Sequence, residues 1–135
     1  MNTQLKKKCE NFDFKELFNK KGYAYFTQGM YNLNLIGVRA SGNQITNTFN
    51  DILVVDYKDE FYDFTPNTEE KGIFGINLHR ANQNIESQLI DKWSAGCQVF
   101  ASPVKFNEFL KLCEAQINNG MGKYFTYTLI NEEDM

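Results

Sequence analysis

The sequence predicts an α+β fold that is mostly β. Short apolar runs rich in β-branched and aromatic residues fill the middle of the chain, and stripes of apolar residues at helical spacing lie near both ends. Polar turns separate these segments, which is the pattern of an antiparallel or mixed sheet with helices packed on it. With 135 residues and 42% hydrophobic content, the chain is long enough for one real core. We therefore expect an N-terminal helical segment over residues 1–22 and a single domain over residues 23–135.

The first expected helix covers residues 11–21. Its apolar side chains Phe14, Leu17 and Phe18 fall on one face at helical spacing. Gly22 follows, and glycine adopts the left-handed conformation that ends many helices. This segment is therefore predicted to be helical up to Gly22.

Five segments have the composition or the alternation of strands. They are residues 32–38, 50–57, 61–64, 72–79 and 124–130. Polar loops are expected over residues 40–44 and 65–71, and Pro66 disfavours strand pairing within the second loop. The fourth strand is expected to end at His79, the only histidine of the chain.

A second helix is predicted to begin at Ser102 and Pro103, because serine is a favoured N-cap and proline suits the first turn. Apolar residues recur at helical spacing as far as Ile117, and Gly120 follows as a helix stop. Cys113 lies within this apolar stripe and is therefore expected to be a small core residue.

Charge and hydropathy limit the partners. The net charge of −3 does not favour nucleic acid, although residues 1–21 carry six Lys against three acidic residues. No apolar stretch approaches the roughly 20 residues that span a bilayer, and the basic N-terminus lacks the apolar segment of a signal peptide. We expect no membrane partner and synthesis in the cytoplasm.

The segment around Cys97 is the strongest indication of chemistry. A thiol acts as a nucleophile when a base takes its proton, and His79 is the one imidazole available. Gly96 precedes the cysteine and allows a ligand to approach the backbone closely. The three cysteines form no CxxC pattern, and one histidine gives no zinc-ligand spacing. We therefore expect a cysteine nucleophile without a metal or a cofactor.

The same residues resemble a known signature. His79, the fourteen residues 80–93 and then Ser94-x-Gly96-Cys97 are similar to the pattern of the L,D-transpeptidase (YkuD-like) family. That family has a second His where this chain has Ala95, and Asn or Arg where it has Val99. The resemblance covers about residues 72–100, and this form of the motif is similar to variants found in bacteriophage genomes.

The resemblance implies a mostly β catalytic domain with a YkuD-like sheet, which acts on the stem peptides of peptidoglycan. Cys97 would attack a peptide carbonyl, and His79 would hold or accept the thiol proton. Backbone N–H groups near Gly96 and Cys97 would stabilise the oxyanion, and Ser94 would shape the turn or donate a hydrogen bond. Arg80 is a candidate for binding a substrate carboxylate, and Trp93 for lining the substrate groove.

Several alternatives stay open at this level. The thioester can be resolved by an amine or by water, so the sequence allows both transpeptidase and peptidase activity. A non-catalytic phage structural or wall-binding protein that keeps the fold is the second class, and Ala95 and Val99 favour it. A conventional cysteine protease is a distant third, because the second half of the chain lacks the His and Asn arrangement of such proteases. Without a signal peptide, a wall-acting chain fits a phage product that is carried in the virion with other phage proteins or released to the periplasm at lysis.

Overall fold

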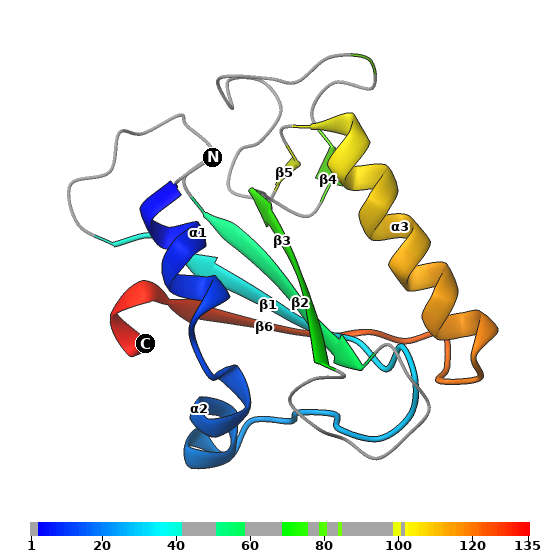
Figure 1. Ribbon diagram of the computed structural model, residues 1–135, viewed down its shortest axis with the longest axis horizontal. Helices are drawn as coiled ribbons and strands as arrows, with labels where there is room; N and C mark the ends of the chain where they lie inside the picture. The colour runs from blue at the N-terminus through cyan, green and yellow to red at the C-terminus, as the bar shows by residue number, and fades with distance from the viewer. Residues whose placement is uncertain are drawn as a thin grey trace.

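The computed structural model describes residues 3–41, 51–58, 69–75, 79–80, 84, 99–100 and 102–135. It is an α+β domain in which helices cover both faces of a mixed sheet (Figure 1). The helices are α1 (Thr3–Glu10), α2 (Phe14–Lys21) and α3 (Pro103–Asn118), and a short 3-10 turn covers Glu132–Asp134. The strands are β1 (Asn34–Arg39), β2 (Ile52–Lys58), β3 (Glu69–Gly75), β4 (His79–Arg80), β5 (Val99–Phe100) and β6 (Thr126–Asn131). The α+β class that the sequence predicts is therefore confirmed.

The main sheet has the strand order β3-β2-β1-β6. Strand β2 is antiparallel to both of its neighbours, whereas β1 and β6 run parallel. The pairing of β1 with β6 continues without a break from Asn34 opposite Thr126 to Arg39 opposite Asn131. A separate pair, β4 and β5, lies near the start of α3 (Figure 1).

Both predicted helices begin and end close to the expected residues. In α2 the Asp13 carboxylate accepts a hydrogen bond from the Glu16 backbone N–H at 3.0 Å, and Gly22 adopts a left-handed φ of 77° after the last turn. In α3 the Ser102 hydroxyl accepts a hydrogen bond from the Lys105 N–H at 3.3 Å. Local capping chemistry therefore determines these ends, as the sequence indicates.

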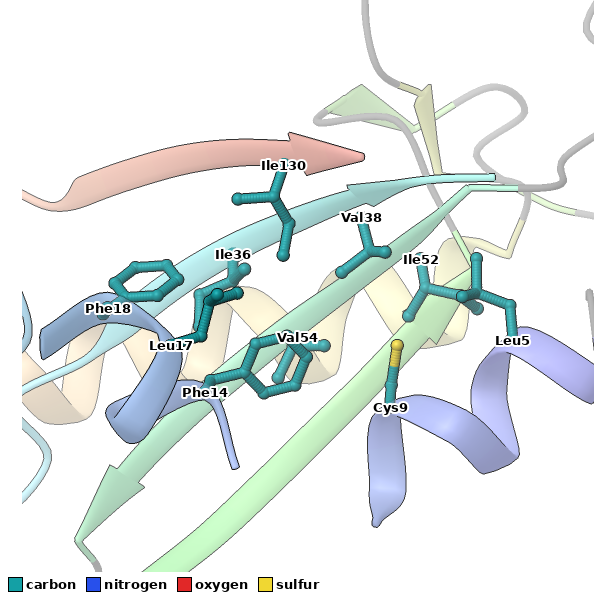
Figure 2. Packing of buried hydrophobic residues seen from close by; sticks show 10 residues of the cluster. All are labelled: Leu5, Cys9, Phe14, Leu17, Phe18, Ile36, Val38, Ile52, Val54 and Ile130. Atoms are coloured by element: carbon teal, nitrogen blue, oxygen red, sulfur yellow. The ribbon is translucent and has the colours of Figure 1, made fainter. Parts of the chain in front are cut away.

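One face of the sheet packs against α1 and α2. Figure 2 shows this first core, in which the two helices direct their apolar side chains onto the strands. Its buried members are Leu5, Cys9, Phe14, Leu17, Phe18, Ile36, Val38, Ile52, Val54 and Ile130. The apolar face predicted for the helix over 11–21 is the face that is buried, and α1 adds a second helix to the same layer.

The opposite face packs against α3 and forms a second core. Its buried members are Leu33, Leu35, Leu53, Val55, Tyr57, Phe100 and Phe109. Because successive residues of a strand point to opposite faces, β2 must be apolar at nearly every position to serve both cores. All seven of its residues are buried, which explains the run Ile-Leu-Val-Val in the sequence.

One buried polar side chain links α3 to the segments next to the second core. Gln116 of α3 is only 1% exposed. Its side-chain oxygen accepts a hydrogen bond from the Leu33 N–H at 3.0 Å, and its nitrogen donates to the carbonyls of Gly122 and Tyr124 at 3.2 and 2.9 Å. One amide thus connects the end of α3, the following turn and the entry into β1.

The strand expected over residues 72–79 differs from the structure. Strand β3 covers Glu69–Gly75 in the main sheet, whereas His79 belongs to β4 in the separate pair. The polar residues at the start of β3 were expected to form a loop, yet their register places Glu69 opposite Lys58 and Lys71 opposite Asp56. This pairing depends on the backbone of β2, a partner that a local sequence pattern does not contain. The expected strand over 61–64 lies outside the described residues.

Candidate active site

The predicted base lies in a short parallel strand pair. His79 of β4 is the register partner of Val99 of β5, and Arg80 is the partner of Phe100. In Figure 1 this pair lies beside the first turns of α3, which contacts both strands. Cys97 lies two positions before Val99 in the sequence. The backbone of the predicted base therefore lies alongside the segment that follows the predicted nucleophile.

The second core anchors this strand pair. The Phe100 side chain has no exposed surface. Its ring lies 5.2 Å from that of Phe106 at an interplanar angle of 73°, and 5.4 Å from that of Phe109 at 32°. These are favourable edge-to-face and tilted aromatic contacts. The position of β5, which begins two residues after Cys97, is thus determined by an aromatic cluster on α3.

The structure describes only two of the predicted site residues. It describes the backbones of His79 and Arg80 in adjacent positions of β4. The other candidates, Trp93, Ser94, Gly96 and Cys97, lie outside the described residues, as does Ala95. Sequence reasoning did not identify Phe100 as the anchor of β5, although an aromatic residue directly before the Ser102 cap is a recognisable signal.

The two cysteines that the structure describes are poor nucleophiles. Cys9 of α1 is fully buried in the first core. Burial raises the pKa of the half-buried Cys113 thiol to about 11, and the negative charge of Glu114 contributes to this rise. A backbone hydrogen bond of Cys113 acts in the opposite direction and lowers the pKa. Because the thiolate is the reactive form, Cys113 stays protonated and inert at neutral pH. Cys113 packs against the second core but is only partly buried, so the expectation of a core residue holds in part.

We predict that iodoacetamide labels Cys113 slowly at pH 7.5 and about tenfold faster for each unit of pH up to its pKa of about 11. Cys9 should stay unlabelled until the protein unfolds, because no part of it reaches solvent. Peptide mapping by mass spectrometry after timed alkylation measures both rates. Labelling of Cys113 that is fast at pH 7.5 and independent of pH would contradict the raised pKa.

A polar network that the sequence did not indicate lies at the other end of the sheet. The Tyr25 hydroxyl donates a hydrogen bond to the carboxylate of Asp56, which is completely buried in β2. Asn34 accepts a hydrogen bond from the Phe26 N–H at 2.7 Å and donates to the carbonyls of Phe26 and Asp56 at 2.9 and 3.1 Å. These bonds hold the segment before β1 against the sheet, and we assign them a structural role.

The described residues also form a surface pocket of about 400 Å³ at the elbow between α1 and α2. It is lined by Asn11, Phe12, Asp13, Glu16, Leu17, Lys20, Asp134 and Met135. Figure 1 shows that this elbow and the C-terminal turn lie at the opposite end of the molecule from β4 and β5. The pocket is therefore separate from the predicted site.

Within the described ranges, no three His, Cys, Asp or Glu side chains gather as metal ligands would. None of the described helices has both the length and the apolar character that a bilayer span requires. Comparisons with protein-family models, with curated proteins and with solved structures found no match to this chain.

Proposed function

We propose that this protein is a cysteine acyl-transfer enzyme of the L,D-transpeptidase (YkuD-like) type, with Cys97 as nucleophile and His79 as base. Its substrate is the stem peptide of peptidoglycan, and neither a metal nor a cofactor takes part. In this proposal the site belongs to a YkuD-like sheet. The phage-like motif indicates a phage protein that is carried in the virion or released at lysis.

The parallel pairing of β4 with β5 carries this proposal. It aligns His79 with Val99, two residues after Cys97 in the chain. A nucleophile and its base need to approach within hydrogen-bond reach, and segments paired side by side are close enough for their side chains to do so. The buried Phe100 ring fixes β5 against α3, so the alignment rests on a packed core.

The chemistry proceeds in two steps. The Cys97 Sγ attacks the carbonyl carbon of the scissile peptide bond while His79 holds the thiol proton. The C–N bond then breaks, the leaving amine takes the proton from His79, and a thioester remains on Cys97. An incoming amine or water attacks this thioester and regenerates the thiol, which gives transpeptidation or hydrolysis.

The neighbouring residues have assigned roles in this proposal. Backbone N–H groups at Gly96 and Cys97 stabilise the oxyanion, and Ser94 shapes the turn before them. Arg80, next to the base in β4, binds a carboxylate of the stem peptide. Trp93 lines the groove that holds the peptide.

A non-catalytic phage structural or wall-binding protein is the second candidate, and one observation favours it. Val99 stands opposite His79 in the strand pair, at the position where the resembled family carries Asn or Arg. The register partner of the proposed base is thus an apolar residue, which removes one polar group of the resembled motif. Ala95 removes another.

Covalent labelling by a carbapenem separates the two candidates. Carbapenems acylate cysteine nucleophiles of this type, so intact-mass spectrometry should show one adduct per chain, mapped to Cys97. The Cys113→Ala variant serves as a matched control and should give the same adduct, because its thiol is protonated. Absence of an adduct, together with slow alkylation of Cys97 by iodoacetamide, would refute the enzyme and favour the binding protein.

A further inference from the structure

We infer that Met121 is a redox-sensitive clamp, and that oxidation of its thioether to the sulfoxide releases the segment that leads into β1. We call this segment, residues 22–33, the strap. In Figure 1 the strap runs from α2 around the lower end of the sheet to the start of β1. The inference concerns a part of the molecule other than the proposed site and does not depend on the proposed function.

The sulfur of Met121 packs directly on the strap. Met121 lies in the turn between α3 and β6 and is partly exposed. A Cβ atom at Gly29 of the strap would overlap the Sδ of Met121 and lie 3.1 Å from its Cε. Gly29 also has a left-handed φ of 85°, a conformation that residues with a side chain rarely adopt. The missing side chain at position 29 therefore creates the space that the thioether fills.

The end of the strap is held in a strained conformation. Tyr31 has a left-handed φ of 57°, which is costly for an aromatic residue. Its N–H donates to the Lys58 carbonyl at 2.8 Å, and its ring stacks on that of Tyr57 at 5.6 Å. The Leu33 N–H donates to the side-chain oxygen of Gln116 at 3.0 Å. A strained segment stays in place only while its surroundings hold it, so the loss of one contact favours its opening.

The sulfur contact and the bond to Leu33 are coupled through one turn. The Met121 N–H donates to the backbone carbonyl of Gln116 at 3.0 Å. The Gln116 side chain donates to two carbonyls of the segment that follows Met121, while its oxygen accepts from Leu33. A displacement of this turn therefore weakens both of its contacts with the strap.

A peroxide is the oxidant in this proposal. The Sδ atom attacks one oxygen of hydrogen peroxide, so that an S–O bond forms and the O–O bond breaks. The hydroxide that leaves takes the proton from the transferred oxygen and departs as water. The sulfur loses two electrons and the peroxide gains them. The sulfoxide is polar and chiral, so it no longer suits the close apolar contact with Gly29.

The opening reaches the second core. Leu33 and Phe100 are both buried members of that core, and Tyr31 packs against it. Release of the strap therefore loosens the cluster that anchors β5. Methionine sulfoxide reductases restore the thioether with a dithiol as electron donor, which makes the change reversible.

Amide hydrogen exchange followed by NMR tests the clamp, in a Cys97→Ala chain so that oxidation of this thiol does not contribute. After treatment with hydrogen peroxide, the amides of Tyr31 and Leu33 should exchange faster by on the order of tenfold or more. The Tyr23 N–H, which donates to the Phe18 carbonyl at 2.9 Å, is the internal control and should keep its rate. Reductase treatment with dithiothreitol should restore slow exchange.

Substitutions identify the sulfur that responds. Met121→Leu keeps the apolar volume and should abolish the response to peroxide. Met30→Leu and Met135→Leu are the matched controls and should keep it. Met121→Gln places a polar group of similar length at this position and should open the strap without peroxide. An unoxidised Met121 in the folded chain, equal acceleration of all three amides, or a response that persists in Met121→Leu would overturn the inference.

Discussion

His79→Ala is expected to slow the acylation of Cys97 by a carbapenem by roughly 10²–10⁴-fold, the usual contribution of a positioned general base. The variant loses the proposed acceptor of the thiol proton, while the β4 backbone keeps its pairing with Val99 and Phe100. Stopped-flow or timed intact-mass measurements of adduct formation give the rate. The midpoint of thermal unfolding should stay close to that of the native chain.

Chemical rescue distinguishes a base from a structural side chain. Added imidazole should restore part of the acylation rate in His79→Ala and should leave the native rate unchanged. The pH dependence should change as well, because without the base the rate follows the thiolate fraction of Cys97 alone. An unchanged acylation rate in His79→Ala would contradict the role of His79 as a base. A large loss of stability without rescue by imidazole would show that His79 has a structural role instead.

Phe100→Ala is expected to lower the free energy of unfolding by about 3–5 kcal/mol, the usual cost of truncating a buried aromatic residue. The side chain is fully buried and contacts the rings of Phe106 and Phe109, so its removal leaves a cavity under α3. Urea unfolding followed by circular dichroism measures the change. Because β5 precedes α3 directly and carries the partner of His79, the same variant should also lose acylation.

Tyr124→Ala is the matched control, because this aromatic side chain is 93% exposed and should contribute no more than about 0.5 kcal/mol. Phe100→Leu keeps most of the apolar volume and should therefore be more stable than the alanine variant. If Phe100→Ala unfolds at the urea concentration of the native chain, the aromatic cluster does not anchor β5.

The sequence predicted the elements whose ends depend on neighbouring residues. The cap at Ser102, the proline at 103 and the left-handed Gly22 each act within one helical turn, and the structure has helices that begin or end there. The apolar run around Ile52 predicted a buried strand for the same local reason, since only a strand buried on both faces is apolar at successive positions.

The sequence did not predict features that depend on partners distant in the chain. Residues 69–71 join β3 through backbone pairing with β2 across the sheet, and β6 pairs with β1 although some ninety residues separate them. Asn34, Asp56 and Gln116 are polar residues whose burial depends on hydrogen bonds from other segments. A local pattern contains none of these partners.

For the candidate site, the sequence alone determined the residue types and their spacing: one histidine, then fourteen intervening residues, then Ser94, Gly96 and Cys97. Only the tertiary structure decided that His79 leaves the main sheet and pairs with the segment after Cys97, in a strand pair held by Phe100. The reason is physical. Side-chain chemistry is a property of each residue, whereas strand pairing is a choice among all segments of the chain, and the packing of the whole core makes that choice.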